Sequence, residues 1–390
     1  MLYSKYDNDE QKLLEQVNNR SYQPIPFDWK MLHNFTANNV KLSDYWRKCP
    51  ITGKVRTDAE LIDCGELIQH SGQAYFHIVH LPFRYPNGTP SIKNSDWANV
   101  QNKIEQIIVD RIIAHNSSIA NSTNSEEEDL ISTLFTGIVF PNLSERITGY
   151  LADKKVHFSF CYFDSPIGIY SSKGDIQDDR FANSEITFNE CIFRYGLAIG
   201  NNAIKKLNLT SCIISERLNF FGSTIEDLWL LQCKFMSEIE IYSTNFDSLL
   251  LGFNRFYKHF KTHSINTKFC NIHYCTFHGG ANFVNLEGQQ TLSCQRNLFK
   301  KQAKFSIKKW PKNPIGWNNM LDQTIFEDNC DFRGSGFGHF GAYSGVEFKD
   351  RLEIDQIASE KSCTEAIYED ISRLKQQSHK LEASSNQTFE

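Results

Sequence analysis

The sequence predicts a mainly β protein whose main part is a right-handed parallel β-helix, and two observations predict it. A cysteine or asparagine followed two places later by an apolar residue recurs every 21 residues, from Cys191 to Cys275. Inside each period the apolar positions recur at steps of six, five, five and five residues. Neither the helical period nor the strict alternation of a long strand fits these steps. A coil of four short sides with 21 residues does fit them.

The repeated motif also predicts the core of this β-helix. In each coil, the cysteine or asparagine and the apolar residue two places later take the inward positions of one short side. Coils stacked at the inter-strand distance of about 4.8 Å would pair their backbones and bury both columns. The recurrent cysteines then act as small packing side chains between stacks of phenylalanine. The predicted core ladder comprises Phe163, Cys191, Phe193, Cys212, Ile214, Cys233, Phe235, Asn254, Phe256, Cys275 and Phe277.

These segments resemble the pentapeptide-repeat family, whose repeat carries a small residue two places before a central leucine or phenylalanine. The resemblance rests on ITFNECIF (186–193), LNLTSCII (207–214), LWLLQCKF (228–235), LLLGFNRF (249–256) and CNIHYCTF (270–277). It covers about 185 residues, from Val156 to about Phe340. The aspartate or asparagine that usually precedes the central residue is mostly missing, as in a divergent branch rich in phenylalanine and cysteine. The resemblance implies a right-handed quadrilateral β-helix and a bacterial protein.

Two departures from this register predict loops that leave the walls of the β-helix. Nine extra residues around 171–179 interrupt the steps between Ile169 and Phe188. The pattern stretches again around 308–319, where two prolines prevent continuous strand pairing.

These two regions supply the predicted interaction surface, because specificity is usually displayed on loops that a rigid frame holds. The first region is acidic, and the second is a basic patch with tryptophans. Lysine combined with aromatic stacking suits phosphate or headgroup binding, and a solvated loop is the alternative. The candidate residues are Lys300, Lys301, Lys304, Lys308, Lys309, Trp310, Lys312, Trp317, Asp175, Asp178 and Asp179.

Outside the β-helix the chain changes character. We predict an N-terminal α/β domain over 1–115, with an amphipathic helix at 7–19 and a strand at 75–83. A polar linker with too little apolar surface to fold follows over 116–130. The β-helix itself is expected over 131–348.

The last part of the chain, 349–390, is predicted to form a helical segment. Its apolar stripe either caps the last coil or makes a homodimer contact, since an uncovered end of a solenoid invites association. The stripe comprises Ile367, Ile371, Leu374 and Leu381. The tail also resembles the helical segment that leads into a pair of membrane helices in some bacterial pentapeptide-repeat proteins. A membrane anchor of that kind requires the native chain to continue past Glu390.

Composition limits the cellular compartment and the kinds of partner that we expect. The charged N-terminus lacks the apolar core of a secretory signal, and no apolar run is long enough for a membrane helix. We therefore expect a cytoplasmic protein, with the inner face of the membrane as the alternative. The formal net charge of −5 provides no overall attraction to nucleic acid, which is not expected as a partner.

The sequence does not predict a catalytic, cofactor or metal site. Eleven cysteines without any CxxC argue against a disulfide framework and a zinc ribbon. Cys270, His273, Cys275 and His278 resemble a zinc ligand set by composition. The coil register places the two thiols inward and the two imidazoles outward, however, so they cannot converge on one ion.

Three functional hypotheses remain. The first is a non-enzymatic scaffold that binds a protein partner of unknown identity, either free or as the soluble part of a membrane-associated protein. The second, suggested by resemblance to gyrase-protecting pentapeptide proteins, is a DNA mimic that regulates a topoisomerase, which requires a strongly acidic face. The third is an unidentified enzymatic activity in the N-terminal domain.

Overall fold

The computed structural model describes the central part of the chain almost completely. Residues 179–309, 321–333 and 345–353 are described without interruption, together with most of 151–170. Shorter described pieces are 67–70, 74–77, 133–136, 139–140 and the single residues 102, 106, 149, 335 and 376.

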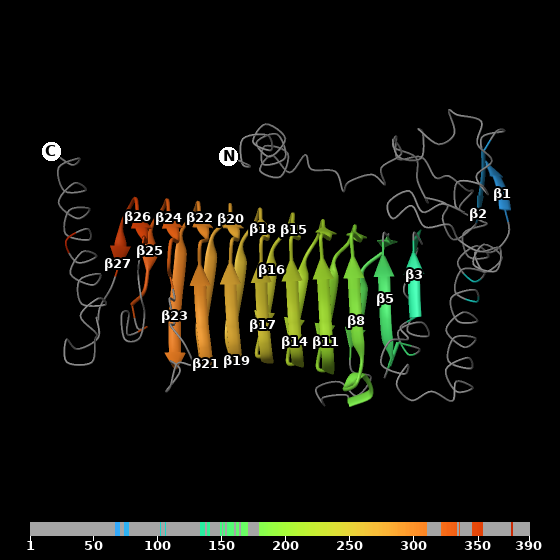
Figure 1. Cartoon of the computed structure of the whole chain (residues 1–390), viewed down its shortest axis with the longest axis horizontal. Coiled ribbons are helices and arrows are strands. Elements are labelled where there is room, and N and C mark those ends of the chain that lie inside the picture. Colours follow the sequence, from blue (N-terminus) through green and yellow to red (C-terminus); the bar gives the residue numbers. More distant parts are fainter. Residues whose placement is uncertain are drawn as a thin grey trace.

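The described residues form a parallel β-solenoid whose coils follow one another along the long axis of Figure 1. One wall, the long wall, covers two successive sides of each coil. Its strands are β3 (Thr133–Thr136), β5 (Lys155–Ser159), β8 (Glu185–Asn189), β11 (Ala203–Thr210), β14 (Thr224–Leu231), β17 (Asn245–Gly252) and the later parts of β19 (Phe260–His273), β21 (Ala281–Gln295) and β23 (Ala303–Lys309).

Two further walls close the coil. The side wall comprises β7 (Ile167–Tyr170), β10 (Leu197–Gly200), β13 (Leu218–Phe221) and β16 (Ile239–Tyr242), and the first halves of β19, β21 and β23 continue it. β25 (Cys330–Asp331) and β27 (Leu352–Glu353) extend the side wall beyond β23. The short wall comprises β4 (Val139–Phe140), β6 (Tyr162–Phe163), β9 (Ile192–Phe193), β12 (Ile213–Ile214), β15 (Lys234–Phe235), β18 (Arg255–Phe256), β20 (Thr276–Phe277), β22 (Leu298–Phe299), β24 (Ile325–Phe326) and β26 (Glu347–Phe348).

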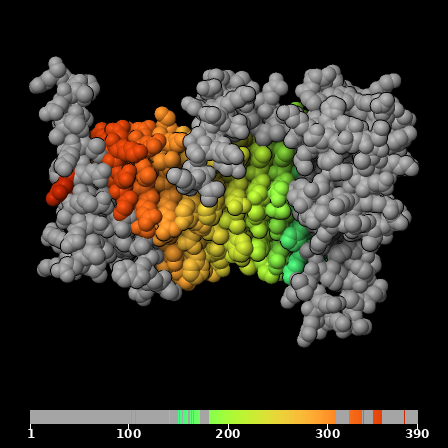
Figure 2. All heavy atoms as spheres, turned by 45° about the horizontal axis from the view of Figure 1, so that its top comes forward, coloured from blue at the N-terminus to red at the C-terminus, as the bar shows by residue number. Residues whose placement is uncertain are grey.

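Strand pairing confirms the predicted coil of 21 residues. On the long wall, Leu209 of β11 lies opposite Leu230 of β14 in a parallel ladder. On the short wall, Ile214 of β12 lies opposite Phe235 of β15. Each partner is one coil further along the chain, so the coils stack in register. Figure 2 shows them as successive bands of colour from green to orange.

The core lies inside this prism. Every residue of the predicted core ladder, from Phe163 to Phe277, is at most 1% exposed. Phenylalanine rings stack along the axis, with ring centroids 4.6 Å apart between Phe256 and Phe277 and 4.5 Å apart between Phe277 and Phe299. The interior therefore contains stacks of aromatic rings that neighbouring coils share, with Ile214 between Phe193 and Phe235.

A polar residue enters the cysteine column without loss of hydrogen bonding. The Asn254 side chain accepts a hydrogen bond from the backbone N–H of Cys233 at 2.8 Å and donates one to the carbonyl of Leu230 at 2.6 Å. Asn297 repeats the arrangement with Cys275 and Ile272. These side chains bond backbone groups of the preceding coil, which makes a buried amide acceptable in an apolar core.

Two corners of the coil use the left-handed backbone conformation. One corner precedes the cysteine column and includes Gln232, Phe253 and Tyr274, whose φ angles lie between 54° and 58°. The other includes Asn201 and Ser243, with φ angles of 53° and 48°. All five of these residues carry a Cβ, so the left-handed conformation strains the backbone at these corners. The conformation allows the chain to turn sharply from one wall to the next.

The two predicted excursions coincide with gaps in strand pairing. β7 ends at Tyr170, and the chain resumes in the short 3-10 helix η3 (Asp179–Phe181). β23 ends at Lys309, and the next strand along the chain is β24 (Ile325–Phe326). β24 pairs with β22 and so continues the short wall after the second excursion. Residues 171–178 and 310–319 lie outside the described residues.

Before the solenoid, β1 (Leu67–His70) pairs antiparallel with β2 (Ala74–His77). β2 overlaps the beginning of the strand that the sequence predicted at 75–83. The predicted helix at 7–19 and the apolar stripe from Ile367 to Leu381 lie outside the described residues, so the N-terminal α/β domain and the C-terminal helical segment stay predictions. Among the described residues, no helix has the length and apolar character needed to cross a bilayer.

Candidate interaction surface

The structure places only part of the basic patch predicted from the sequence. Lys300 and Lys301 lie at the corner after β22, and Lys304 lies on the side-wall part of β23. Lys308 and Lys309 belong to the last residues of β23. Outside the described residues lie Trp310, Lys312, Trp317, Asp175 and Asp178, and Asp179 opens η3. Whether this set binds a partner stays a prediction.

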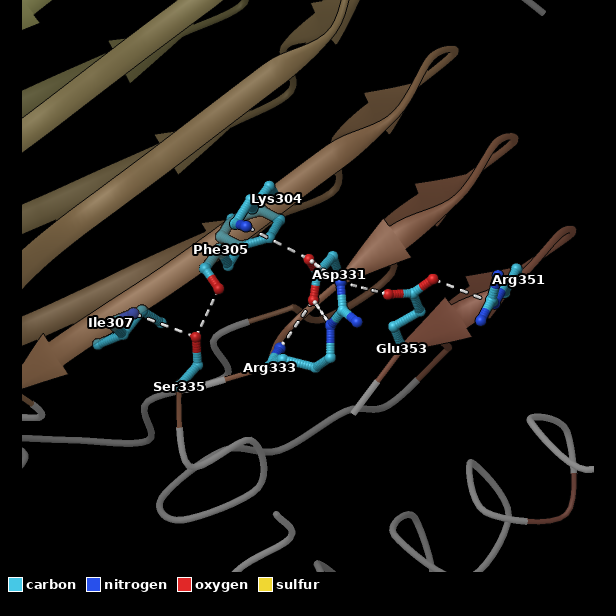
Figure 3. A network of polar contacts seen from close by, with 8 residues as sticks. All are labelled: Lys304, Phe305, Ile307, Asp331, Arg333, Ser335, Arg351 and Glu353. Carbon is cyan, nitrogen blue, oxygen red and sulfur yellow. Dashed lines mark hydrogen bonds and ion pairs between the residues drawn. The ribbon is translucent and has the colours of Figure 1, made fainter. Parts of the chain in front are cut away.

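Lys304 belongs to a charged network on the last coils (Figure 3). Its ammonium lies 3.5 Å from Asp331, whose side chain is only 8% exposed. Arg333 donates two hydrogen bonds to the Asp331 carboxylate, at 2.9 and 3.0 Å. Arg333 also pairs with Glu353 at 2.6 Å, and Arg351 pairs with Glu353 at 3.1 Å. The network holds successive coils together, and its charges are already mutually paired.

A serine completes the same region of Figure 3. The Ser335 hydroxyl donates to the carbonyl of Phe305 at 2.5 Å and accepts from the backbone N–H of Ile307 at 3.1 Å. These backbone groups of β23 lie beyond the two residues that pair with β25. A buried side chain therefore bonds these backbone groups of β23 beyond the end of the two-residue strand β25.

An exposed aromatic surface, which the sequence analysis did not single out, lies on the long wall and on its corner with the short wall. Its most exposed members are Phe253, Phe269 and Tyr274, at 52%, 39% and 36% exposure. Half-buried apolar side chains adjoin them on neighbouring strands. We call this surface the aromatic patch; it comprises Trp229, Leu231, Leu250, Phe253, Phe269 and Tyr274.

Strand register brings the members of the aromatic patch together. Trp229 of β14 lies opposite Leu250 of β17. The rings of Phe253 and Tyr274, one coil apart, stack with centroids 4.7 Å apart and an interplanar angle of 4°. An exposed aromatic stack beside half-buried apolar side chains typically marks an interaction site.

Two cations border the aromatic patch. The Lys206 ammonium lies 4.0 Å from the centroid of the Trp229 ring. The Arg296 guanidinium lies over Tyr274, at 5.4 Å from the ring centroid, and donates to its hydroxyl. Neither cation forms an ion pair with any residue that the structure describes. The patch therefore combines an apolar centre with a positive rim.

One sequence signal could have found the aromatic patch. Phe253 and Tyr274 are 21 residues apart and immediately precede the inward positions Asn254 and Cys275. Aromatic side chains at an outward position of two successive coils have to stack on the surface. The sequence analysis followed the inward positions alone and so missed them.

A second aromatic group lies at the end of the side-wall strands. Tyr170, Phe221 and Tyr242 are 53%, 36% and 37% exposed. The rings of Tyr170 and Phe221 lie 5.9 Å apart across the intervening coil, where Gly200 provides the room. The Phe221 ring occupies the place that a Cβ at position 200 would need.

The thiols of Cys270 and Cys275 are poor nucleophiles. Burial raises the pKa of Cys270 and Cys275 to about 12. Cys270 and Cys275 lie inside the prism, whereas His273 lies on the outer surface beside Phe253. His278 is only 6% exposed and stacks on Tyr257. Within the part of the chain that the structure describes, no group of three His, Cys, Asp or Glu side chains is arranged to hold a metal ion.

Comparison of the chain with protein-family models, with curated proteins and with solved structures gives no match. The β-solenoid assignment therefore rests on the parallel strand register and on the buried ladder of this chain itself.

Proposed function

We propose that this chain is a non-enzymatic scaffold of the pentapeptide-repeat type, and that it binds a protein partner through the aromatic patch. The observation that carries the proposal is the exposed stack of Phe253 and Tyr274 with the adjoining apolar side chains. Aromatic side chains at the centre of a surface supply most of the energy of protein association. The positive rim of Lys206 and Arg296 favours a partner surface with an apolar centre and an acidic border.

The rigid frame supports this role. Trp229, Leu250 and Phe269 lie on strands that pair with a strand on each side. Phe253 and Tyr274 lie on the adjoining corner, where their backbone N–H groups donate to carbonyls of the next coil. A preorganised surface loses little conformational entropy on binding, so more of the contact energy appears as affinity. A solenoid is therefore a suitable support for a small, fixed set of contact residues.

The charge distribution of the walls favours the scaffold over the DNA-mimic hypothesis. Acidic side chains on the described walls are interleaved with lysines and pair with them, as in Glu185–Lys205 at 2.7 Å and Asp247–Lys268 at 2.6 Å. A DNA mimic needs a continuous acidic face with the charge spacing of a duplex. No such face is present on the part of the solenoid that the structure describes.

Affinity capture with the full chain and two matched variants tests the proposal. The patch variant carries Phe253→Ser and Tyr274→Ser, and the control carries Tyr170→Ser and Tyr242→Ser on the side wall. We expect both the native chain and the control to retain a partner protein. The patch variant should retain at least tenfold less of it, because the loss of two central aromatic contacts weakens binding and each tenfold loss of affinity corresponds to about 1.4 kcal/mol. Direct titration of that protein then gives its dissociation constant.

Equal retention by the native chain and the patch variant would show that the aromatic patch does not carry partner binding. Loss of retention in the control alone would show that the partner binds the side wall and not the aromatic patch.

A further inference from the structure

Four cysteines form an unbroken column inside the solenoid, just before the short wall. They are Cys161, Cys191, Cys212 and Cys233, one on each of four successive coils, and each is at most 1% exposed. The backbone carbonyl of each of the first three accepts a hydrogen bond, at 2.9 Å every time, from the N–H that follows the next cysteine. The four residues, which we call the thiol column, therefore repeat at one constant step, the strand spacing of about 4.8 Å.

The side chains of the thiol column repeat in the same way. The Sγ atoms of Cys191, Cys212 and Cys233 each lie 3.3–3.4 Å from two carbonyl oxygens. One oxygen belongs to the residue two places earlier in the same coil. The other belongs to the residue three places before the preceding cysteine of the column. Because all three side chains make the same two contacts, successive sulfur atoms are also one coil apart.

The gap between successive sulfur atoms suits one metal cation placed in line between them. Bonds between a metal and a thiolate are about 2.3 Å long, so two such bonds in line span about 4.6 Å. This span is close to the coil step of about 4.8 Å. Thiolates select soft cations such as Cu(I), and monovalent cations of this class accept two ligands in a line. Such a site needs two ligands only, which agrees with the lack of a three-ligand group among the residues that the structure describes.

We propose that the thiol column binds a soft monovalent cation of the Cu(I) class, held in line between the sulfur atoms of neighbouring cysteines. Each cation replaces one thiol proton, which passes to solvent. The thiolate of one cysteine and the thiol sulfur of its neighbour then bind the cation, so the bridge is neutral and puts no unpaired charge into the core. The site lies inside the prism and does not depend on the proposed function of the aromatic patch.

The backbone around the thiol column tolerates the loss of a thiol proton. The carbonyl of Thr210, which the Cys212 thiol contacts, also accepts a hydrogen bond from the backbone N–H of Glu190 at 2.9 Å. The carbonyl of Leu231, beside Cys233, likewise accepts from a backbone N–H at 2.8 Å. Binding of a cation therefore leaves neither of these carbonyls without a donor.

Other buried cysteines of the solenoid lack a thiol neighbour along the axis and provide a comparison. Cys275 takes the same inward position further along the chain, but its neighbours in the column are Asn254 and Asn297. Cys270 lies opposite a leucine on each neighbouring coil. Both cysteines are 1% exposed. They match the thiol column in residue type and burial, and differ from it in the identity of the axial neighbour.

Anaerobic titration with Cu(I) against a chromophoric Cu(I) chelator tests the proposal on the full chain. The column variant carries Cys191→Ser and Cys233→Ser, which leaves the other two thiols of the column two coils apart. The control variant carries Cys270→Ser and Cys275→Ser. The parent of both variants retains the eight cysteines of the solenoid and has serine at three further positions: Cys49, Cys64 and Cys363.

We expect the parent and the control variant to bind Cu(I) equally well. The column variant should bind it at least about tenfold more weakly, because an isolated thiol supplies one bond in place of two. Serine is an acceptable replacement in this core, where Ser223 is itself 1% exposed. Equal affinities of the parent and the column variant, or a control variant that loses as much affinity as the column variant, would overturn the proposal.

Thermal unfolding of the parent gives a readout that requires no variant to fold. A ligand that binds the folded state raises the unfolding midpoint, whereas a cation that binds the thiols of the unfolded chain lowers it. We expect Cu(I) to raise the midpoint of the parent, and a lower midpoint would overturn the proposal.

X-ray absorption at the copper edge then identifies the ligands in the loaded parent. We expect two sulfur neighbours for each copper ion. Three sulfur neighbours, or nitrogen or oxygen ligands, would exclude the linear bridge and assign the cation to another site.

Discussion

At the scale of single residues, position within a coil decides whether a side chain is essential or dispensable. Phe235 and Lys234 are neighbours in sequence, but Phe235 is 1% exposed and stacks on Phe256 at 5.1 Å, whereas the Lys234 side chain is exposed. The same alternation repeats at every coil. A substitution therefore has to be judged by its place in the coil and not by its residue type alone.

We expect Phe235→Ala to destabilise the solenoid by about 3–5 kcal/mol, because it leaves a cavity between Ile214 and Phe256 in the buried ladder. Lys234→Ala is the matched control and should change stability by less than about 0.5 kcal/mol. Denaturant unfolding monitored by circular dichroism measures both. Similar losses in the two variants would contradict the assigned coil register.

The left-handed corners predict a stabilising substitution. Ser243 has a φ angle of 48° and an exposed side chain, so a glycine there would relieve the strain of a Cβ in this conformation. We expect Ser243→Gly to raise the free energy of unfolding by about 0.5–1 kcal/mol. Removal of the Cβ relieves strain in the folded state, and this gain exceeds the loss that comes from the greater conformational entropy of glycine in the unfolded chain. Thr224→Gly, within strand β14, is the control and should lower it. A loss of stability in Ser243→Gly would mean that the corner is not left-handed.

At the scale of secondary-structure elements, the last coils depend on charges as well as on strand pairing. β25 and β27 are only two residues long and pair over two positions. The ion pairs among Lys304, Asp331 and Arg333 supplement these short ladders. Hydrogen bonds from the Arg333 side chain hold the pKa of Asp331 below its ordinary value.

This depressed pKa predicts an acid-sensitive C-terminal end. Because the folded-state pKa lies below the unfolded-state value, the carboxylate stabilises the fold above the unfolded-state pKa of about 4, and this contribution is lost as the pH falls through the folded-state pKa. Hydrogen exchange of the backbone amides in β25 and β27 should therefore accelerate as the pH falls below about 4, relative to the intrinsic exchange rate.

Asp331→Asn should remove this acid-dependent acceleration, at the cost of lower protection at neutral pH. Asp350→Asn replaces an exposed carboxylate on the same coils and serves as the control. If the pH dependence persisted unchanged in Asp331→Asn, another group would be responsible.

At the scale of the whole molecule, the sequence predicted the repeat but not the surface that the repeat displays. The period of 21 and the inward columns are visible in the sequence because burial restricts each inward position to a few residue types. Outward positions are under no such restriction, so their residue types do not reveal a pattern. The contact of Lys206 with Trp229 and the Phe253–Tyr274 stack become visible once the register of neighbouring coils is known. The network around Asp331 was missed because its partners lie on coils of irregular length.

The basic patch illustrates the same difference. The sequence shows its lysines as a cluster along the chain, whereas the structure separates their roles. Lys304 is paired with Asp331, and Lys300 and Lys301 lie on the corner beside the short wall. Proximity along the chain is a poor guide to a shared surface in a solenoid, because residues a few places apart, such as Lys301 at the corner and Lys304 on the side wall, lie on different parts of the coil.

The central claim is that the coils stack in register at a fixed rise, and distances between spin labels along one corner test it most directly. Glu216, Lys301 and Asp350 are exposed and each follows a short-wall strand two residues after its inward residue. Through the paired short-wall strands, Lys301 is four coils and Asp350 six coils beyond Glu216. Their backbone separations should be about 19 and 29 Å at a rise of about 4.8 Å per coil.

Labels are attached to cysteines at these positions, with Cys49, Cys64 and Cys363 replaced by serine. Double electron–electron resonance should give two narrow distributions whose mean distances differ by about 10 Å, which is two coils at the strand spacing. Broad distributions, or a Glu216–Asp350 distance no longer than the Glu216–Lys301 distance, would contradict the solenoid and with it the surfaces that it displays.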